Sequence, residues 1–434
     1  MNPVRIGICG LGTVGGGTFN VLQRNAEQIA ARAGRPVVVT LVAARQLNPD
    51  CDLGSTRVTT DVFEVAEDPE VDVVVELIGG YDVSRELALK AIANGKHVVT
   101  ANKAMIAVHG NEIFQAAAKK GVSVGFEASV AGGIPIIKAL REGLAANEVS
   151  WLAGIINGTS NFILTEMREK GREFADVLKE AQELGYAEAD PTFDVEGIDA
   201  AHKLTILASV AFGIPLQFDK AFTEGISKLS PRDVSYAEEL GYRIKHLGIA
   251  RRLEQGIELR VHPTLVPESQ LIAKVDGVMN AVMVEGDAVG QTLFYGRGAG
   301  SEPTASAVVA DIIDVARALR EGTSVAVPFL GVSQDRLNDH EVLPVEETTS
   351  AYYLRILAQD RPGVLANVAS ILSEHGINIE SIMQKESEES EGLIPMILLT
   401  HKVQEKQMNH AIAAIEALDA VADPVVRIRV ELLR

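Results

Sequence analysis

A glycine-rich loop near the start of the chain has the residue types and spacing of a dinucleotide-binding turn. It follows the apolar run Val4–Cys9 directly, and its residues are Gly10, Leu11, Gly12, Thr13, Val14 and Gly15. In such a loop the first glycine allows a tight turn, the second lets the main chain approach a pyrophosphate, and the third lets the helix pack closely on the strand. The spacing therefore predicts binding of NAD or NADP and, with it, hydride transfer.

The end of the second apolar run bears on which dinucleotide is bound. The run Val37–Ala43 is followed by Ala44 and Arg45, and the next acidic residue is Asp50. An acid at this place would bind the ribose hydroxyls of NAD, whereas a guanidinium can hold the extra phosphate of NADP with two hydrogen bonds. Arg45 favours NADP; NAD remains the alternative if Arg45 is only a solvated residue at a strand end.

Asp199 and Lys203 begin a strongly apolar helical stretch, and their position predicts proton transfer. An Asp and a Lys four residues apart on a helix usually form a solvent-facing ion pair. Here, at about 100° per residue, the pair shares a face with Ile206 and Val210 and points toward apolar packing. A lysine partly withdrawn from water gives up its proton more readily, which suits Lys203 to acid–base work. We expect His202 to lie on a separate polar arc, at the surface.

Acidic residues crowd into a turn just before this stretch. They are Glu188, Asp190, Asp194 and Glu196, around Pro191. Such clusters are usually solvated, and this spacing does not fit a calcium loop. Beside the Asp–Lys pair, the cluster better fits a site that holds an amino group and a hydroxyl.

Lys103 lies just beyond the apolar run His97–Thr100. Ligands of parallel sheets bind beyond the carboxyl ends of the strands, so Lys103 is a candidate ligand contact. A surface lysine in a loop is the alternative.

The pattern of elements places these residues in an α/β chain. Residues 1–132 alternate apolar strands with helical stretches such as Ser84–Asn94 and Asn111–Lys120, which predicts a Rossmann-type, doubly wound parallel sheet. Residues 133–332 mix longer helices with strands and lack this alternation. They are predicted to form an α+β domain for catalysis and dimerisation, whose last helix, about 304–320, packs back on the first domain.

The polar stretch 333–350 has no apolar periodicity and is expected to be a linker. Residues 351–434 are predicted to have the βαββαβ order of a ferredoxin-like fold. The predicted elements are Tyr352–Ala358, Val364–His375, Ile377–Gln384, Leu393–Thr400, Glu405–Leu418 and Val425–Leu433. The acidic run Glu386–Glu391 is expected to be a solvated hairpin turn.

Composition limits the classes of partner. The chain has 434 residues, of which 47% are hydrophobic, so it can bury more than one core. Its net charge of −19 disfavours nucleic acid and anionic membranes. Its two cysteines, Cys9 and Cys51, allow at most one disulfide, and Cys9 lies in a predicted strand. With no secretory signal and no apolar stretch long enough to cross a bilayer, we expect a cytoplasmic protein without nucleic-acid or membrane partners.

A longer set of residues resembles the homoserine dehydrogenase family. The main motif is Ala181-x-x-x-Gly185-Tyr186-Ala187-x-x-Asp190-Pro191-x-x-Asp194-Val195-x-Gly197-x-Asp199-x-x-x-Lys203. The glycine loop, Thr100–Lys103, Asn157–Asn161 and Gly298–Gly300 also resemble that family, in the expected order, over about residues 4–330. The resemblance implies reversible NAD(P)-linked interconversion of L-homoserine and L-aspartate 4-semialdehyde, in the branch leading to threonine and methionine.

The resemblance also implies residue roles. The lysine matching Lys203 is the general acid/base for the substrate oxygen, and the matching acids hold the substrate or position the water near it. The implied substrate-binding residues are Glu188, Asp194, Asp199 and Lys103. The implied cofactor contacts, besides the glycine loop and Arg45, are Lys103, Gly185 and Gly300. Reducing an aldehyde by hydride needs a proton donor at the carbonyl oxygen, so this assignment is chemically consistent.

The stretch Glu127–Pro135 resembles a loop of that family that binds a monovalent cation, such as Na⁺ or K⁺. The implied ligands are the side chain of Glu127 and the main-chain carbonyls of Val130, Gly132 and Ile134. Without the resemblance, this stretch is only a glycine-rich turn from strand to helix.

Residues 351–434 resemble an ACT domain, through Asp360–Leu365 at the first turn and Gly376–Ile379 at the entry to the next strand. The resemblance implies feedback by L-threonine; the alternative is a dimerisation module without a ligand. A homo-oligomer, a dimer or tetramer, is expected.

Two rival functions are left open at this point. One is reduction of another small amino-aldehyde with NADPH. The other is a non-catalytic sensor that binds nucleotide and amino acid, against which the expected burial of Asp199 and Lys203 argues.

Overall fold

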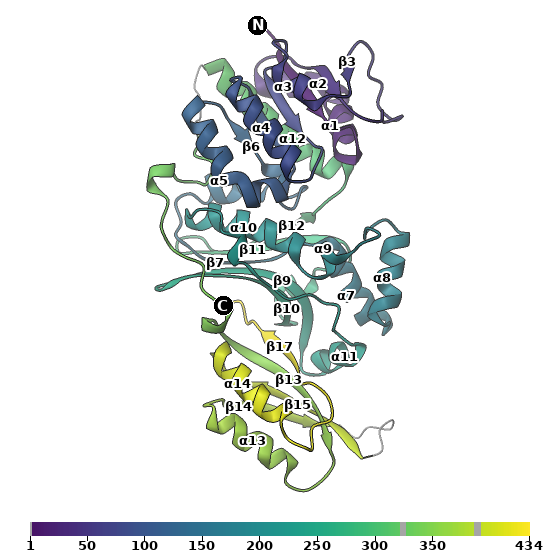
Figure 1. Ribbon diagram of the computed structural model, residues 1–434, viewed down its shortest axis with the longest axis vertical. Coiled ribbons are helices and arrows are strands. Elements are labelled where there is room, and N and C mark those ends of the chain that lie inside the picture. The colour runs from purple at the N-terminus through teal and green to yellow at the C-terminus, as the bar shows by residue number, and fades with distance from the viewer. Residues whose placement is uncertain (1, 322–326, 386–391) are drawn as a thin grey trace.

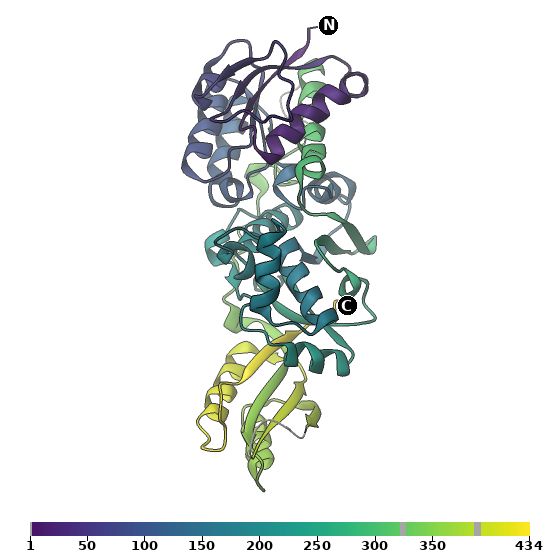
Figure 2. The same cartoon turned by 90° about the vertical axis from the view of Figure 1, so that its right-hand side faces the viewer.

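The chain forms three parts stacked along one axis, seen from two sides in Figures 1 and 2. The computed structural model describes residues 2–321, 327–385 and 392–434, so the acidic run Glu386–Glu391 lies outside the described residues. The α/β fold class predicted from the sequence is confirmed, as the following three parts show.

The first part is a six-stranded parallel sheet in the order β3-β2-β1-β4-β5-β6, which is the doubly wound Rossmann order. Its strands are β1 (Val4–Cys9), β2 (Val37–Ala43), β3 (Arg57–Thr59), β4 (Val73–Glu76), β5 (His97–Thr100) and β6 (Val124–Gly125). Its helices are α1 (Thr13–Arg24), α2 (Ala26–Ala33), α3 (Val62–Glu67), α4 (Asp82–Ala93) and α5 (Lys103–Lys120). Helix α5 begins earlier than its apolar pattern predicts, because Asn102 caps it by accepting from the N–H of Met105 at 3.0 Å.

A helix from far along the chain completes this sheet. Helix α12 (Ser301–Glu321) packs against α1, and its buried residues Val308 and Ile312 join Phe19 and Ile8 in one apolar cluster. The opposite face of the sheet is covered by α3, α4 and α5. Both faces of the parallel strands are therefore buried, as all-parallel sheets require.

The second part sets helices against a mixed sheet. Its helices are α6 (Ile136–Lys138), α7 (Gly158–Lys170), α8 (Phe174–Glu183), α9 (Thr192–Val195), α10 (Ile198–Phe212) and α11 (Pro231–Glu239). Its strands are β7 (Val149–Ile155), β8 (Phe222–Thr223), β9 (Tyr242–Leu253), β10 (Gly256–Pro267), β11 (Met279–Gly286) and β12 (Gly290–Arg297). Helix α10 contacts both this sheet and α5 of the first part, so it lies between the two domains.

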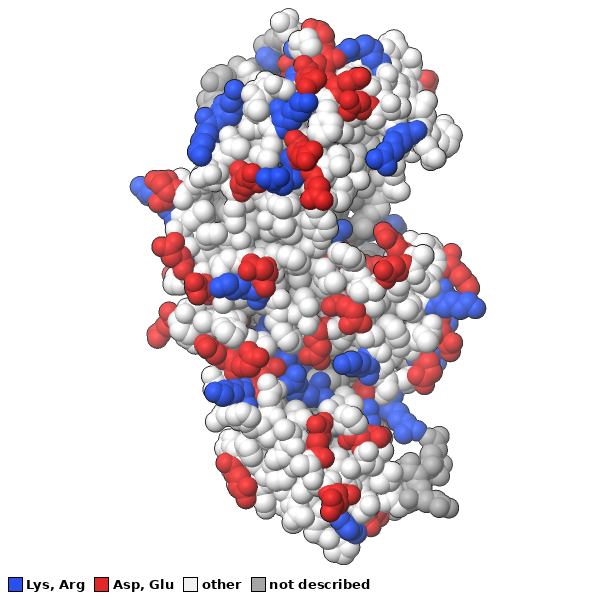
Figure 3. Space-filling view, in the orientation of Figure 1, with Lys and Arg blue, Asp and Glu red and all other residues white. Residues whose placement is uncertain are grey.

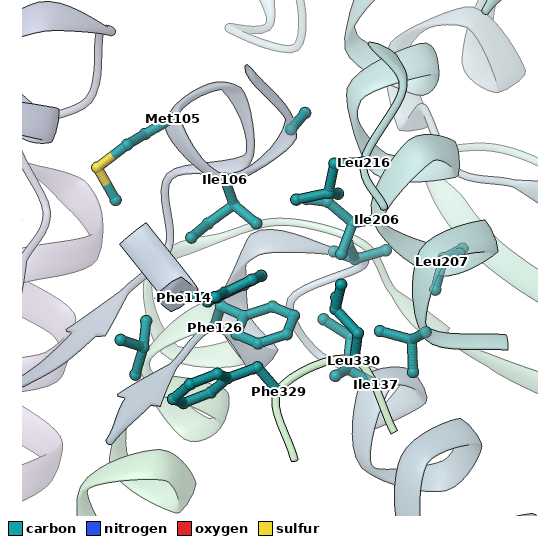
Figure 4. Packing of buried hydrophobic residues seen from close by; sticks show 14 of the residues in the cluster. Met105, Ile106, Phe114, Phe126, Ile137, Ile206, Leu207, Leu216, Phe329 and Leu330 are labelled. Carbon is teal, nitrogen blue, oxygen red and sulfur yellow. The ribbon is translucent and has the colours of Figure 1, made fainter. Parts of the chain in front are cut away.

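An apolar cluster joins the first two parts. Figure 4 shows Phe114 and Phe126 of the first domain near Ile206 on α10, with Phe329 beside them. The ring of Phe114 lies 5.1 Å from each of the other two phenylalanine rings, centre to centre. Each such buried side chain contributes about 1.5–3 kcal/mol of hydrophobic stabilisation.

The third part has the predicted βαββαβ order, with one additional two-residue strand, Val403–Gln404, ahead of its second helix. Its elements are β13 (Thr349–Gln359), α13 (Val364–Glu374), β14 (Ile379–Gln384), β15 (Leu393–Thr400), β16 (Val403–Gln404), α14 (Glu405–Glu416) and β17 (Val426–Val430). Strand β17 pairs in parallel with β10, so the second and third parts share one sheet with the order β12-β11-β7-β9-β10-β17-β13-β15-β14.

The segment 333–350 runs along the second part and is hydrogen-bonded to it. The N–H of Asn338 donates to the carbonyl of Gly213 at 2.8 Å, and the N–H of Leu343 donates to the carbonyl of Ile257 at 2.9 Å. The C-terminal end of the third part also packs against the second part, because Leu433 is buried in a cluster with Trp151 of β7. The third part is thus attached to the second at both ends.

Candidate active site

The dinucleotide loop joins β1 to α1, and its glycines have different surroundings. Gly10 has a φ of +96°, and a Cβ there would lie 2.6 Å from the carbonyl oxygen of Leu77. A Cβ on Gly15 would lie 2.0 Å from the carbonyl oxygen of Gly10, whereas one on Gly12 would meet nothing within 4 Å. The other predicted contacts in the loop are Leu11, which is buried, and Thr13 and Val14, in the first turn of α1. Gly12 thus leaves open space beside the start of α1, where the free N–H groups of a helix N-terminus can bind an anion.

Two other predicted cofactor residues lie at this edge of the sheet. Gly300 precedes Ser301, whose hydroxyl donates to the carbonyl of Thr13 at 2.8 Å, so the start of α12 is fixed beside the loop. Arg45 is exposed just beyond the end of β2, the neighbour of β1. Its side chain is exposed to solvent, and no described residue forms an ion pair with its guanidinium.

A buried carboxylate that the sequence reasoning missed organises the same edge. Glu76, the last residue of β4, accepts from the N–H groups of Ile78 and Gly79 at 3.0 and 3.2 Å and from the hydroxyl of Thr100 at 2.6 Å. The N–H of Asn102 donates to that hydroxyl, one residue before Lys103. Burial raises the pKa of Glu76 despite these hydrogen bonds. An acid at the end of an otherwise all-valine strand was the available signal.

Asp199 is the centre of the candidate active site, because groups from both domains converge on its carboxylate. The ammonium of Lys203, one turn along α10, lies 2.7 Å from Oδ2, and the ammonium of Lys103, at the start of α5, lies 3.1 Å from Oδ1. The side-chain amide of Asn157 donates to Oδ2 at 2.9 Å. Lys203 also donates to the carbonyl of Ile156 at 2.8 Å. The side chain of Lys103 is 39% exposed, while those of Lys203 and Asp199 are 12% and 8% exposed.

The electrostatics of this cluster keep it charged. Burial by itself would raise the pKa of Asp199, but the ammonium groups of Lys203 and Lys103 outweigh it and hold that pKa far below its usual range. The charge of Asp199 in turn raises the pKa of Lys103, against the effect of burial. Asp199 is therefore an anion, and Lys103 a cation, throughout the physiological pH range.

Asp194 and Glu188 flank the cluster. The side-chain amide of Asn157, which also caps α7, donates to Asp194 Oδ1 at 2.8 Å, and burial raises the pKa of Asp194. Glu188 is exposed, and its charge also raises the pKa of Lys103, so the two groups are near each other. The turn that carries Glu188 is attached to α7 through the hydroxyl of Thr159, which donates to the carbonyl of Tyr186 at 2.6 Å.

Other residues of the acidic turn point elsewhere. Asp190 accepts from the hydroxyl of Thr192 at 2.6 Å, and Glu196 accepts from the hydroxyl of Ser227 at 2.7 Å. Gly185 is exposed after α8, with a φ of +73°, and a Cβ there would meet nothing within 4 Å. The structure thus separates the acids of the turn into two that flank Asp199 and two that do not.

The expectation that His202 lies at the surface is wrong. Its side chain is buried, its ring stacks on Phe218 with centres 4.2 Å apart, and its Nε2 lies 3.3 Å from the hydroxyl of Tyr81 in the first domain. Burial lowers its pKa to about 4. A polar arc on a helix faces either water or the polar edge of another domain, and helical phase alone does not distinguish the two.

The glycine-rich turn after β6 has a buried acid at its centre. The two carboxylate oxygens of Glu127 accept from the N–H groups of Ile137 and Lys138 at 3.0 and 2.8 Å. Burial, with the nearby charge of Asp311, raises the pKa of Glu127 to about 7. The turn is strained, because Ala131 has a φ of +48°.

The carbonyls of this turn bear on cation binding. That of Ile134 accepts from the N–H of Ile136 at 2.8 Å, while those of Val130 and Gly132 accept no hydrogen bond from any residue that the structure describes. Free carbonyl oxygens beside a carboxylate are a donor set that suits a hard cation. Within the same described ranges, no group of three or more His, Cys, Asp and Glu side chains has the arrangement of a metal site.

The site lies where the molecule narrows. Figure 3 shows the surface hollowed between the first domain and the part of the second that carries α8 and α9. Among the described residues, no helix has the length and apolarity needed to cross a membrane.

Three family models match the chain in sequence. They are the NAD-binding domain of homoserine dehydrogenase over residues 10–127, the homoserine dehydrogenase domain over 135–313 and the ACT domain over 352–420. The second of these spans the Asp199 cluster, and the first spans the glycine loop and Lys103.

Whole-chain relatives agree with these matches. The homoserine dehydrogenase of Pseudomonas aeruginosa is 72% identical over 433 residues, covering all of both chains. The crystal structure of a homoserine dehydrogenase from Thiobacillus denitrificans superposes with a TM-score of 0.95 at 63% identity, covering 100% of this chain and 99% of that one. A hyperthermophilic archaeal homoserine dehydrogenase in complex with NADPH matches 72% of this chain and 98% of its own, with a TM-score of 0.61 at 26% identity.

Proposed function

Because this chain belongs to the homoserine dehydrogenase family and is an oxidoreductase, we propose that its Asp199–Lys203 pair is where L-homoserine and L-aspartate 4-semialdehyde are interconverted. One observation carries the assignment: a buried carboxylate is held between two lysines from two domains, beside the edge of the sheet that carries the dinucleotide loop.

Lys203 is the residue that moves the substrate proton. An ammonium has three N–H donors, and two of them are used by Asp199 and the carbonyl of Ile156. The third is free to donate to the carbonyl oxygen of the semialdehyde, which becomes the hydroxyl of homoserine; in the reverse direction, the neutral amine takes that proton back. The nicotinamide, when bound, supplies or accepts the hydride.

The surrounding charges hold the substrate. Asp194 and the exposed Glu188 attract its ammonium group, since both carboxylates lie near Lys103 at the edge of the Asp199 cluster. Lys103, cationic and 39% exposed, reaches from the first turn of α5 toward the place where cofactor and substrate meet. The side-chain amide of Asn157 donates to both Asp194 and Asp199 and so fixes the two carboxylates relative to each other.

NADP is the preferred dinucleotide in this proposal. Arg45 stands exposed at the strand end where an acid would favour NAD, and the archaeal relative named above was solved with NADPH. We place Gly185 and Gly300 beside the dinucleotide as well, Gly300 with the support of the Ser301 hydrogen bond to the loop.

Four further features complete the proposal. Glu127, with the carbonyls of Val130, Gly132 and Ile134, holds a monovalent cation, supported by the two free carbonyls. The ACT domain binds L-threonine as a feedback effector. Strands β12 and β14, at the two ends of the long sheet, are edges at which copies can associate into a dimer or tetramer. The two cysteines are unpaired thiols, which fits a cytoplasmic enzyme.

The decisive experiment replaces Lys203 by alanine. We expect reduction of L-aspartate 4-semialdehyde by NADPH to fall by about 10²–10⁴-fold, the contribution of a positioned general acid. NADPH binding, followed by the fluorescence of the reduced nicotinamide, should persist. Lys220→Ala, which removes an exposed lysine of the same domain, is the matched control and should keep full activity. A Lys203→Ala protein as active as the wild type would refute the proposal.

A further inference from the structure

Two side chains that touch across the first two domains have no part in the mechanism described so far. Tyr81 lies in the first domain, immediately before α4, and His202 lies on α10, one residue before Lys203. The hydroxyl of Tyr81 and Nε2 of His202 are 3.3 Å apart, and the side chain of His202 is buried. A polar contact between two domains, this close to Lys203, can set how the domains meet at the active site.

One face of α10 is directed at the first domain. Asp199, His202 and Ile206 follow the three- and four-residue spacing of a single helix face. Asp199 binds Lys103, and Ile206 joins the apolar cluster between the two domains (Figure 4). The contact between His202 and Tyr81 therefore lies along this face, between the apolar packing and the ion pair.

Tyr81 is held in a fixed relation to Lys103 within the first domain. The carbonyl of Gly80, the residue before Tyr81, accepts from the side-chain amide of Asn102 at 2.8 Å. Asn102 in turn caps α5, whose first residue is Lys103. Gly80 has a φ of +79°, which glycine adopts without strain, so the chain can turn here. Tyr81 and Lys103 thus belong to one hydrogen-bonded unit at the carboxyl edge of the sheet.

His202 is held in a similar way within the second domain. Its ring stacks on Phe218 with centres 4.2 Å apart and on Phe193 with centres 6.4 Å apart. Phe193 belongs to α9 and adjoins Asp194, so the imidazole is packed against the turn that carries this acid. These contacts limit rotation of the imidazole, and its Nε2 is the atom that faces Tyr81.

A neutral imidazole suits this position. Burial lowers the pKa of His202 to about 4; the charges of Lys103 and Lys203 also lower it, while the charge of Asp199 opposes the shift. A neutral ring can pair with the hydroxyl of Tyr81 through Nε2 as donor or as acceptor, depending on the tautomer. It also adds no third positive charge beside the two lysines, so the contact joins the domains without changing the charge of the Asp199 cluster.

We propose that Tyr81 and His202 are a positioning pair, whose hydrogen bond holds the first domain against α10 and so aligns Lys103 with the Asp199–Lys203 pair around the substrate. This role rests on the proposed function of that pair, through which Tyr81 and His202 act. A displacement of about 1 Å between reacting groups can cost about 10²-fold in rate, so loss of this one hydrogen bond should slow turnover.

The test replaces Tyr81 by phenylalanine, which removes only the hydroxyl. We expect kcat for reduction of L-aspartate 4-semialdehyde by NADPH to fall by about five- to tenfold, the value of one hydrogen bond. The Kd of NADPH, followed by the fluorescence of the reduced nicotinamide, should stay within about twofold, because the dinucleotide loop is unchanged. A folded Tyr81→Phe protein with the kcat of the wild type would overturn the proposal. So would a parallel loss of NADPH binding, which would place Tyr81 at the cofactor.

A double-mutant cycle tests whether the two residues act as one contact. His202→Leu removes the other partner, and Tyr81→Phe combined with His202→Leu should lose little more kcat than His202→Leu alone. Losses of kcat that multiply in the double variant would show two independent roles and would overturn the pairing.

Tyr353→Phe is the matched control. It also removes a hydroxyl that joins two domains, because Tyr353 of the ACT domain donates to Asp233 of α11 at 3.1 Å. We expect a lower melting temperature and the kcat of the wild type, since this contact is remote from Lys203. An equal fall of kcat in Tyr353→Phe and Tyr81→Phe would show a general effect of weakened domain contacts and would refute a positioning role.

The positioning role and the proposed function can fail separately. If Lys203→Ala loses turnover while Tyr81→Phe keeps it, the assignment of the active site stands and the positioning pair is refuted. If Lys203→Ala is as active as the wild type, the proposed function falls, and the positioning role falls with it whatever the result for Tyr81→Phe.

Discussion

The two junctions of this molecule both contain buried charges, but they are built differently. Between the first and second domains, Asp199 is held by two lysines, one of which is 39% exposed. Between the second and third domains, Arg429 is fully buried and bonded to Glu405, which is 2% exposed, and to Glu224 at 2.8 Å. The hydroxyl of Tyr352 adds a further bond to Glu405.

The difference shows that burial of a charge does not by itself indicate catalysis. At the ACT junction every nitrogen of the Arg429 guanidinium has a carboxylate partner and the side chain is fully buried, so a ligand cannot reach it. At the Asp199 cluster one N–H of Lys203 has no partner among the described residues, and Lys103 reaches solvent. The junction at Asp199, which we call incomplete because groups there remain available to a ligand, is the reactive one. The junction at Arg429, which we call complete because that guanidinium is buried with every nitrogen paired, holds domains together.

The largest expected effect is on catalysis at the incomplete junction. Asp199→Asn removes the charge that positions both lysines, and we expect kcat for semialdehyde reduction to fall by about 10²–10⁴-fold. Asp190→Asn is the matched control, since among the described residues Asp190 hydrogen-bonds only to Thr192 in the same turn, and the kcat of this variant should stay near the wild-type value. Equal loss in both variants would contradict the assignment.

At the complete junction we expect a loss of stability instead. Arg429→Met leaves Glu405 buried without its partner and should lower the free energy of unfolding by about 3–5 kcal/mol, measured by urea denaturation. The folded variant should retain kcat. Arg317→Met, at an exposed ion pair with Asp314, should cost less than about 1 kcal/mol. If Arg429→Met abolished turnover without loss of stability, the contrast between the junctions would fail.

A third effect concerns the turn at Glu127, where two acids, Glu127 and Asp311, are buried close to each other. The pKa of Glu127 is raised to about 7 and that of Asp311 to about 6, mainly by burial, although Lys138 and Arg141 lie nearby. The folded state thus holds protons that the unfolded state has already released, so stability should fall as pH rises from about 4 to about 7. Melting temperature against pH tests this, and Asp311→Asn should flatten the slope.

A bound cation would change that profile. KCl should raise the melting temperature more at pH 8 than at pH 5, because ionised Glu127 is the better ligand. Tetramethylammonium chloride, too large for the turn, is the control for ionic strength. An equal rise with both salts would argue against a specific cation site.

The smallest expected effect is on cofactor choice. Arg45→Ala should raise KM for NADPH by about tenfold, the value of a guanidinium–phosphate contact, and leave KM for NADH unchanged. Steady-state kinetics with both cofactors measure this directly. An equal change in both KM values would show that Arg45 does not contact the extra phosphate of NADPH.

Features carried by neighbouring residues were predictable from the sequence, and contacts between distant segments were not. The glycine loop and the Asp199–Lys203 pair each lie within one turn, so residue spacing fixed their geometry. The salt bridge from Lys103 to Asp199 joins residues on two domains and required the fold. The same holds for the pairing of β10 with β17, which no local pattern signals.

Two residues show how local reasoning fails. His202 was placed at the surface because the helix was considered alone, whereas Tyr81 and Phe218 cover it in the fold. The local sequence gives Glu76 no role, since its partner Thr100 lies on another strand, β5. In both cases the environment of the side chain is set by a segment distant in sequence that packs against it in the fold.

The return of α12 to the first domain also sets the order in which the protein can mature. While the chain leaves the ribosome, the strands of the first domain emerge first, but one face of their sheet is covered only by α1 and α2 until Val308 and Ile312 follow. The dinucleotide-binding domain therefore cannot complete its folding as an independent N-terminal unit, the usual course for multidomain chains. Its nascent form must wait, with part of an apolar face exposed, for most of the second domain to be translated.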